Sequence, residues 1–447
     1  MSETIYALAS APGRAGIAVY RLSGPQSGAA LAAITGTDLP KPRLATRSGV
    51  IDPASGEKID EGLVLWFPAP HSYTGDDVAE LHLHGGTAVR QRVFEILNRC
   101  DGLRMAEPGE FTRRAVLAGK IDFTGAEGLI DLIDAETDAQ RRQALLQSQG
   151  VLGELYDSWR DKLLPSLAHM EAAIDFPDED LPVDVEAAIW PTVKTLIQEI
   201  EHHLEDGHRG EILRDGLKIA IVGPPNVGKS SLLNWLASRE AAIVSAIEGT
   251  TRDVIEVHLD LGGFPVVLAD TAGIRDARSD IESMGIERTF QRAAMSDLKI
   301  VVVAADQMAA TGPAIDMIDS ETIFVVNKVD LVEPDMGHVT ERLGDLGQDF
   351  YPISVTNEVG LEKLVDHLIK EVEKRLNTGS APTITRHRHR SALGKCLEAL
   401  NRIKDQENSE LCAEDLRMAT RFLGVLTGSV DVEDLLDVIF QDFCIGK

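Results

Sequence analysis

The sequence is poor in cysteine and has no long apolar run. Its 447 residues include four cysteines, Cys100, Cys396, Cys412 and Cys444, which form neither a C-x-x-C pair nor a dense framework. This excludes a disulfide-stapled scaffold and fits a reducing cytoplasm. No apolar stretch reaches about 18 residues, so we expect no membrane span. The start, Met1-Ser2-Glu3-Thr4, lacks the basic and apolar segments of a secretion signal.

Basic charge is also scarce. The chain holds 44 lysines and arginines against 72 aspartates and glutamates, a formal net charge of −28. General nucleic-acid binding relies on neutralising phosphates, so any RNA contact requires a local basic patch or a partner's surface. The densest basic run is Arg386-His387-Arg388-His389-Arg390. We interpret it either as a solvated helix start or as a contact with an RNA backbone.

A glycine loop at Gly223–Ser231 organises the chain. It follows the apolar run Leu217–Val222, which predicts a buried strand, and precedes Leu232–Leu236, which predicts the start of a helix. Strand, loop and helix are the context that a G-x-x-x-x-G-K-[ST] phosphate loop requires. Its backbone N–H groups and the helix N-terminus can surround phosphate oxygens. Lys229 can reach the β- and γ-phosphates, and the Ser230 hydroxyl can bind Mg²⁺.

Four further stretches follow in the order that a GTPase requires. Gly249–Asp253 offers a threonine for Mg²⁺, and Asp270–Gly273 ends an apolar strand. Asn327–Asp330 ends another strand, and the Asp330 carboxylate offers two acceptors to the ring N–H and amino group of guanine. This predicts GTP rather than ATP. Ser354–Thr356 occupies the last base-contacting loop, where such proteins more often carry Ser-Ala-Lys.

The chain lacks the glutamine that orients the attacking water in Ras-like enzymes. Ile274 stands at that position, and an apolar side chain cannot orient water. Another group must do so, with candidates in the charged stretch Arg275–Glu282. Arg252 and Arg275 are conceivable arginine fingers.

Residues 1–118 carry short apolar runs broken by turn residues, which predict a compact α+β domain. Val78–His84 alternates like a strand and places Glu80, His82 and His84 on one face. The two histidines could bind a metal or simply pack, and Glu80 is a possible polar group of a pocket.

Residues 119–215 lack strand signals and are rich in Ala, Leu, Glu and Gln, and helical patterns return in residues 377–447. Between them lies the nucleotide-binding segment 216–376. We therefore expect a helical domain in two parts, with the nucleotide domain inserted between them.

Taken together, the markers resemble the MnmE (TrmE) family of tRNA-modification GTPases from end to end. The family-like stretches are Pro108–Ala115, the phosphate loop with Asn226, Gly249–Asp253, Asp270–Arg275 and Phe443–Lys447. The resemblance implies a multidomain α+β and α/β fold. Its parts are an N-terminal folate-binding and dimerisation domain, a discontinuous helical domain and an inserted Ras-like P-loop GTPase domain.

The resemblance also implies a K⁺-dependent GTP hydrolase that works with the flavoprotein MnmG as a heterotetramer. Together they attach an aminomethyl or carboxymethylaminomethyl group to C5 of the wobble uridine of certain tRNAs. The one-carbon unit comes from 5-formyl- or 5,10-methylene-tetrahydrofolate. GTP, Mg²⁺, K⁺ and the folate are the implied cofactors, and a cytoplasmic homodimer is the implied state.

Site residues are carried over by position. The residues expected to bind GTP are Asn226, Val227, Gly228, Lys229, Ser230, Ser231, Ser245, Ala246, Ile247, Glu248, Gly249, Thr250, Thr251, Asp270, Thr271, Ala272, Gly273, Asn327, Lys328, Asp330 and Ser354. The Mg²⁺ ligands would be Ser230 and Thr251, and the K⁺ ligands Asn226, Ser245, Ile247 and Thr250. Folate would contact Arg21, Glu80, Lys120 and Lys447. The catalytic residues would be Lys229, Glu282, which orients the attacking water, and Cys444, which tRNA modification needs.

Two other functions stay open at this point. A regulatory GTPase of ribosome assembly would use the same nucleotide domain as a switch, and a scaffold would bind GTP without hydrolysing it. The N-terminal domain and the Cys-Ile-Gly-Lys ending argue against the first. Intact Lys229, Ser230, Asp270 and Glu282 argue against the second.

Overall fold

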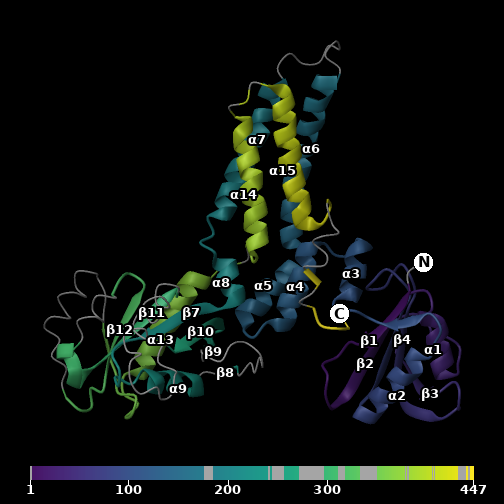
Figure 1. The fold of residues 1–447 in the computed structure, drawn as a ribbon, viewed down its shortest axis with the longest axis horizontal. Helices are drawn as coiled ribbons and strands as arrows, with labels where there is room; N and C mark the ends of the chain where they lie inside the picture. The colour runs from purple at the N-terminus through teal and green to yellow at the C-terminus, as the bar shows by residue number, and fades with distance from the viewer. Residues whose placement is uncertain are drawn as a thin grey trace, which may run out of the picture. The chain divides into compact units, whose positions relative to one another are not determined.

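The computed structural model of the chain (Figure 1) describes residues 3–175, 185–239, 242–243, 256–270, 296–310, 318–332, 350–377, 379, 382–404, 406, 408–430, 439–440 and 443–446. It divides into two compact units. The first comprises Met1–Ile130, Leu146–Leu196 and Gly394–Lys447, and the second Asp131–Leu145 and Ile197–Leu393. The predicted domain boundaries after residues 118, 215 and 376 stay predictions.

The first unit contains a six-stranded sheet of order β3-β4-β5-β2-β1-β6. Its strands are β1 (Thr4–Leu8), β2 (Ala15–Ser23), β3 (Thr46–Ile51), β4 (Lys58–Phe67), β5 (Val78–Gly85) and β6 (Leu103–Met105). Only β1 and β6 pair in parallel; the other described pairs are antiparallel. The helices α1 (Ser27–Thr35) and α2 (Thr87–Asn98) bury apolar side chains together with one face of the sheet.

Strand alternation explains how this sheet presents a polar face. Tyr20 and Leu22 of β2 and Leu81 and Leu83 of β5 are buried in the core beneath the helices. Their neighbours along each strand point to the opposite face because successive side chains alternate. The sequence thus places the polar members of β2 and β5 together on the face opposite α1 and α2.

Helices form the rest of the first unit and part of the second. They are α3 (Glu110–Leu117), α4 (Phe123–Asp134), α5 (Asp138–Ser148), α6 (Val151–Asp175), α7 (Val185–Leu204), α14 (His387–Ile403) and α15 (Ser409–Thr427). α6 packs against α15, which comes from the other side of the nucleotide-binding segment. The Asn408 side chain caps α15 by accepting hydrogen bonds from the N–H groups of Glu410 and Leu411, and Gly428 ends it with φ 82°. The predicted helical domain in two parts is confirmed.

The second unit contains a seven-stranded sheet of order β13-β12-β11-β7-β10-β9-β8. Its elements are α8 (Arg209–Asp215), β7 (Leu217–Val222), α9 (Lys229–Arg239), β8 (Ala242–Ile243), β9 (Glu256–Leu261), β10 (Phe264–Asp270), β11 (Leu298–Ala304), η1 (Ala305–Ala310), β12 (Thr322–Asn327), β13 (Phe350–Pro352) and α13 (Leu361–Leu376). β10, β7, β11, β12 and β13 run parallel to one another. Apolar clusters lie on both faces of the sheet. Strands buried on both faces consist of continuous apolar runs, as predicted for a parallel sheet.

The helix α13 shows how the sequence covers this sheet. Leu361, Leu364, Leu368, Val372 and Leu376 recur at three- and four-residue spacing and are all buried. Burying such a side chain contributes roughly 1.5–3 kcal/mol. The fold-class prediction of an α+β domain, a helical domain and a P-loop α/β domain is confirmed.

Among the helices that the structure describes, none combines the length and the apolar character that a membrane crossing needs.

Candidate functional site

The phosphate loop follows β7 and requires its glycines. Gly223 (φ 145°) and Gly228 (φ 98°) have positive φ. A Cβ on Gly223 would overlap the carbonyl oxygen of Val302, and one on Gly228 would overlap the side-chain amide of Asn327. Asn226 also adopts a left-handed conformation (φ 61°), which asparagine tolerates better than most residues. The loop is therefore a tight turn that other side chains do not fit.

Lys229 begins α9 and bends back over this loop. Its side chain is buried, and the Nζ atom donates hydrogen bonds to the carbonyl oxygens of Gly223 (2.9 Å) and Pro224 (2.7 Å). Ser230, the next residue, lies at the exposed start of the same helix. An ammonium group and a helix N-terminus at one loop favour a phosphate there.

Asn327 ends β12 and ties two loops together. Its Nδ2 donates to the carbonyl oxygen of Val227 (2.8 Å), and its Oδ1 accepts from the N–H of Val355 (3.2 Å). The residue is 3% exposed. The sequence identified Asn327 as a base contact but did not show this bridge between the phosphate loop and the loop after β13.

The other candidate base contacts surround that bridge. Lys328 (φ 62°) and Asp330 follow Asn327 at the carboxyl end of β12, and Asp330 is exposed. Ser354 is buried, and its Oγ accepts a hydrogen bond from the N–H of Asn357 (3.1 Å). The structure thus collects the described base-contact candidates at one edge of the sheet.

Asp270 ends β10, where the register pairs it with Ile221 of β7, one strand from the phosphate loop. The remaining nucleotide-site candidates lie outside the described residues. They are Ser245, Ala246, Ile247, Glu248, Gly249, Thr250, Thr251, Thr271, Ala272, Gly273 and Glu282, together with Arg252, Ile274 and Arg275. Val227 and Ser231 are the remaining nucleotide-site candidates that lie among the described residues of the phosphate loop.

A second group of polar side chains lies on the face of the N-terminal sheet opposite α1 and α2. Arg21 and Glu80 face each other across β2 and β5, with 3.0 Å between Arg21 Nε and Glu80 Oε1. Glu80 Oε2 lies 3.1 Å from His82 Nε2. The Arg21 guanidinium lies 5.5 Å from the centroid of the Tyr73 ring and 5.7 Å from that of Phe111. The pair is half-buried and held by aromatic walls, which fixes the direction of both charged groups.

The segment between β4 and β5 links this pair to Lys120. Tyr73 in this segment bonds Thr112, with 2.8 Å between the two hydroxyl oxygens, and burial raises the pKa of the tyrosine. Lys120 Nζ donates to the carbonyl oxygen of Pro70 in the same segment (2.7 Å). Arg21 and Lys120 therefore both contact residues 70–73, and Glu80 is joined to them through Arg21. Lys447 lies outside the described residues, and Cys444 is exposed.

Comparison with known proteins decides the family. The model of the GTP-binding protein TrmE N-terminus matches residues 4–120, and the model of the MnmE helical domain matches residues 123–444. The chain belongs to the MnmE family of tRNA modification GTPases. Relatives carrying the name tRNA modification GTPase MnmE come from Paramagnetospirillum magneticum (54% identical), Parvibaculum lavamentivorans (52%) and Rhodospirillum rubrum (50%). Each match spans all of this chain and 99–100% of the relative.

Among solved structures, the FeoB G-domain from Methanococcus jannaschii is 24% identical, with a TM-score of 0.26. The match covers 35% of this chain and 98% of that one. With a TM-score this low, the match assigns neither a fold nor a function to this MnmE-family chain.

The structure bears on the predictions made for His82 and His84 and for the basic run Arg386–Arg390. His84 Nδ1 lies 2.8 Å from Asp60 Oδ1, and His82 bonds Glu80. In the described part of this MnmE-family chain no three His, Cys, Asp or Glu residues are grouped to hold a metal ion. The polar contacts account for both histidines.

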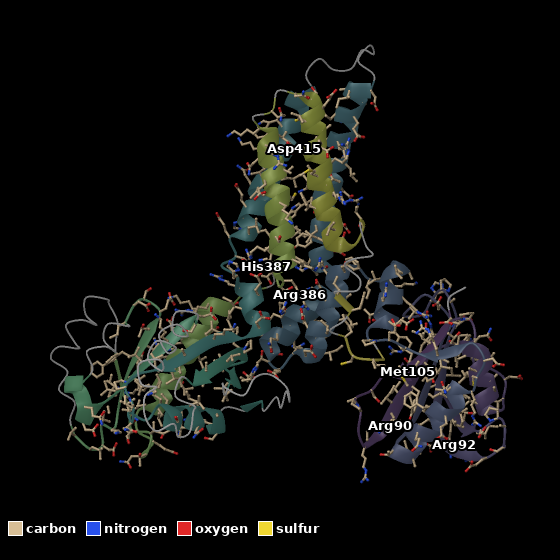
Figure 2. The ribbon with its side chains drawn as sticks, in the orientation of Figure 1. Arg90, Arg92, Met105, Arg386, His387 and Asp415 are labelled. Carbon is tan, nitrogen blue, oxygen red and sulfur yellow. The ribbon has the colours of Figure 1, made fainter. Side chains whose placement is uncertain are left out.

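The basic run opens α14, where Figure 2 labels Arg386 and His387, and two of its arginines are paired within the chain and not solvated. Arg386 Nη2 lies 2.6 Å from Asp131 Oδ1. Arg390 bonds Asp206 (2.7 Å) and Glu211 (3.1 Å), and all three side chains are at most 16% exposed. The interpretation as a solvated helix start was wrong for these two arginines, because the acidic chain uses their charge internally. The RNA contact stays a prediction. No sequence signal identified the acidic partners, which lie far away along the chain.

Proposed function

We propose that the protein hydrolyses GTP in a K⁺-dependent reaction and, with the flavoprotein MnmG, modifies tRNA. The product would carry an aminomethyl or carboxymethylaminomethyl group at C5 of the wobble uridine, with the carbon supplied by 5-formyl- or 5,10-methylene-tetrahydrofolate. The main support is that one MnmE-family chain combines a closed phosphate loop with the Arg21–Glu80 pair in its N-terminal sheet. We propose a cytoplasmic homodimer that binds MnmG as a heterotetramer.

The phosphate loop fits a magnesium nucleotide. Lys229 already points its ammonium group at the carbonyl oxygens of the loop, so a bound phosphate can take over those interactions. The Ser230 hydroxyl is exposed at the same helix start and is an oxygen ligand of the kind that Mg²⁺ prefers. The exposed Asp330 carboxylate can accept both donors of a guanine edge. Thr251 would complete the Mg²⁺ ligands.

Asn226 fits the K⁺ site. Its side chain is exposed on the phosphate loop, and its amide oxygen is a hard ligand for an alkali cation. We assign the other ligands to Ser245 and to the backbone of Ile247 and Thr250. The cation would supply positive charge beside the β- and γ-phosphates, where other GTPases use an arginine. Glu282 would orient the attacking water in place of the missing glutamine.

The N-terminal pair fits an acidic folate. Arg21 is fixed by Glu80 and by two rings, and Lys120 lies against the adjoining segment. Two cations near one segment suit the carboxylates of a folate glutamate tail, and we assign Lys447 to the same group. Cys444 serves the modification chemistry and not GTP hydrolysis. The ribosome-assembly alternative has no support from the family assignment.

The test compares GTP hydrolysis in KCl and in NaCl at equal ionic strength for the wild type and for Glu282→Ala. We expect strong K⁺ stimulation that disappears in the variant. Equal rates in the two salts would contradict the cation assignment and would favour Arg252 or Arg275 as the missing charge. Nucleoside analysis of tRNA from cells carrying Cys444→Ser tests the modification separately, with loss of the wobble group as the expected result.

A further inference from the structure

The stretch Pro108–Ala115 has no role in the function proposed above, yet several hydrogen bonds fix its conformation. Glu110 begins α3 and is nearly buried. Its carboxylate accepts hydrogen bonds from Arg104 (2.6 and 2.8 Å), from Arg114 (3.0 Å) and from the N–H of Glu107 (2.9 Å). Two arginines and a main-chain donor on one nearly buried carboxylate fix the turn that precedes the helix.

The main chain of this turn binds the segment Cys444–Gly446. The Gly109 N–H donates to the carbonyl oxygen of Cys444 (3.3 Å), and Pro108 and Ile445 form an antiparallel bridge. Gly446 has φ 104°, and a Cβ there would overlap the carbonyl oxygen of Leu8. Cys444 itself stays exposed. The backbone around the cysteine is therefore held on both sides while its thiol is left accessible.

Gly109 is a second tight point of this contact. Its φ is 66°, and an added Cβ would lie 2.8 Å from Phe440 Cδ1 and 2.9 Å from Phe443 Cβ. Both rings are buried (4% and 5% exposed) and pack with Phe123 of α4. A side chain at position 109 cannot be accommodated without moving the rings that precede Cys444.

The first turn of α3 contacts the Arg21–Glu80 pair and the rings around it. Phe111 forms one of the two walls beneath the Arg21 guanidinium, and Thr112 bonds the Tyr73 hydroxyl that belongs to the other wall. Positions 109 and 112 are three residues apart, less than one turn of about 5.4 Å pitch. One short piece of chain thus contacts the Cys444 segment with its first residues and the Arg21 walls with the following ones.

We propose that Gly109 is a positioning residue, which seats the segment Cys444–Gly446 so that the exposed thiol is held at a fixed place relative to the Arg21–Glu80 pair. The inference rests on the proposed function, because it takes the folate and the cysteine to serve one reaction. In this proposal the stretch Pro108–Thr112 connects the segment Cys444–Gly446 to the Arg21–Glu80 pair. GTP hydrolysis does not involve this contact.

The test uses full-length Gly109→Ala, with Gly56→Ala as the matched control. Gly56 also has positive φ (72°) in the N-terminal domain, but no atom lies within 4 Å of an added Cβ. The control therefore reproduces the backbone strain without the clash. Gly446→Ala, which disturbs the same contact from the Leu8 side, is a second variant in case Gly109→Ala does not fold.

Three readouts separate positioning from general damage. Gly109→Ala should lower kcat of tRNA modification at least tenfold, while KM for the folate and the rate of GTP hydrolysis stay within twofold of the Gly56→Ala values. Brief chymotrypsin digestion should cleave after Phe443 faster than in the control, detected by intact mass as loss of the residues that follow it.

Two results would overturn the inference. The first is wild-type modification by an uncleaved variant whose segment chymotrypsin cleaves faster than in Gly56→Ala. The second is a segment that is cleaved no faster than in Gly56→Ala in either Gly109→Ala or Gly446→Ala. The proposed function fails differently. If Cys444→Ser modifies tRNA normally, the role of the cysteine is wrong, whereas the chymotrypsin comparison of the two glycine variants still reports whether Gly109 seats the segment.

Discussion

The side-chain amide of Asn327 donates a 2.8 Å hydrogen bond to the main-chain carbonyl of Val227, 100 residues earlier in the chain. The same side chain accepts a hydrogen bond from the N–H of Val355. The phosphate loop and the base-contacting loop are thus joined through one buried amide. Nucleotide affinity should depend on this bridge as well as on direct contacts.

Replacing Asn327 with Asp should weaken GDP binding by roughly ten- to a hundredfold. The variant loses the Nδ2 donor and places a carboxylate against the carbonyl of Val227, and an unsatisfied buried polar group costs about 1–3 kcal/mol. Titration with a fluorescent GDP analogue measures the effect. Asn357→Ala, which changes an exposed side chain in the neighbouring loop, is the control. Equal affinities for the two variants would show that the bridge carries no binding energy.

Replacing Arg390 with Ala should lower the free energy of unfolding by roughly 2–3 kcal/mol, because it removes the cation beside Asp206 in a largely buried place and leaves Glu211 with His208 alone. Breaking a fully buried pair costs about 3–5 kcal/mol, and these side chains keep some exposure. Urea unfolding followed by circular dichroism gives the value. Arg142→Ala breaks the exposed pair with Asp138 and should cost less than about 1 kcal/mol.

A loss of RNA affinity in an Arg386–Arg390 variant should accompany this loss of stability. A stable Arg390→Ala protein with weakened RNA binding would instead support the interpretation of this run as an RNA contact.

Acidification should destabilise the protein through His203. Burial is the main cause that lowers the pKa of this imidazole from 6.5 to about 4, and the nearby Arg390 adds to it. Between these two values the unfolded chain binds a proton that the folded chain does not. Stability is therefore complete above pH 6.5 and falls as the pH drops towards 4.

At pH 5 the effect amounts to roughly 1–2 kcal/mol. His203→Gln should flatten the pH dependence of the urea midpoint between pH 7 and 5, whereas His202→Gln, at an exposed position, should leave it unchanged. Parallel pH profiles for the wild type and His203→Gln would count against this assignment.

Replacing Arg21 with Lys should reduce binding of 5-formyl-tetrahydrofolate at least tenfold. A lysine keeps the charge, but it loses the planar group that lies over Tyr73 and Phe111 while bonding Glu80. Isothermal titration calorimetry measures the affinity. Arg47→Lys changes an arginine that is 79% exposed and should bind as the wild type does. Unchanged affinity in Arg21→Lys would remove Arg21 from the folate site.

The sequence predicted most of the architecture because its signals are local. The continuous apolar runs before Gly223 and Asn327 form buried parallel strands, and the alternation in Val78–His84 forms β5 with its polar face. The phosphate loop could be located because only glycine suits positions 223 and 228. Each of these features depends on neighbouring residues and on their periodicity.

Long-range pairings could not be predicted. Nothing in the run Arg386–Arg390 shows that Asp131 and Asp206 will lie beside it, because that depends on how the helices before and after the nucleotide segment meet. The same holds for Asn327 with Val227 and for Gly109 with Cys444. The sequence suggested a chemistry for single residues, whereas their partners required the fold.

The contact between Gly446 and Leu8 sets an order of events during synthesis. Leu8 can enter its sheet once β6 has been made, whereas Gly446 follows only after the helical and nucleotide-binding elements have been made. The N-terminal sheet can therefore fold on a growing chain, but the place where Cys444 is seated does not yet exist. A truncated or stalled product keeps the folded sheet and lacks Cys444, so the modification chemistry proposed for this cysteine requires the elements on both sides of the nucleotide-binding segment.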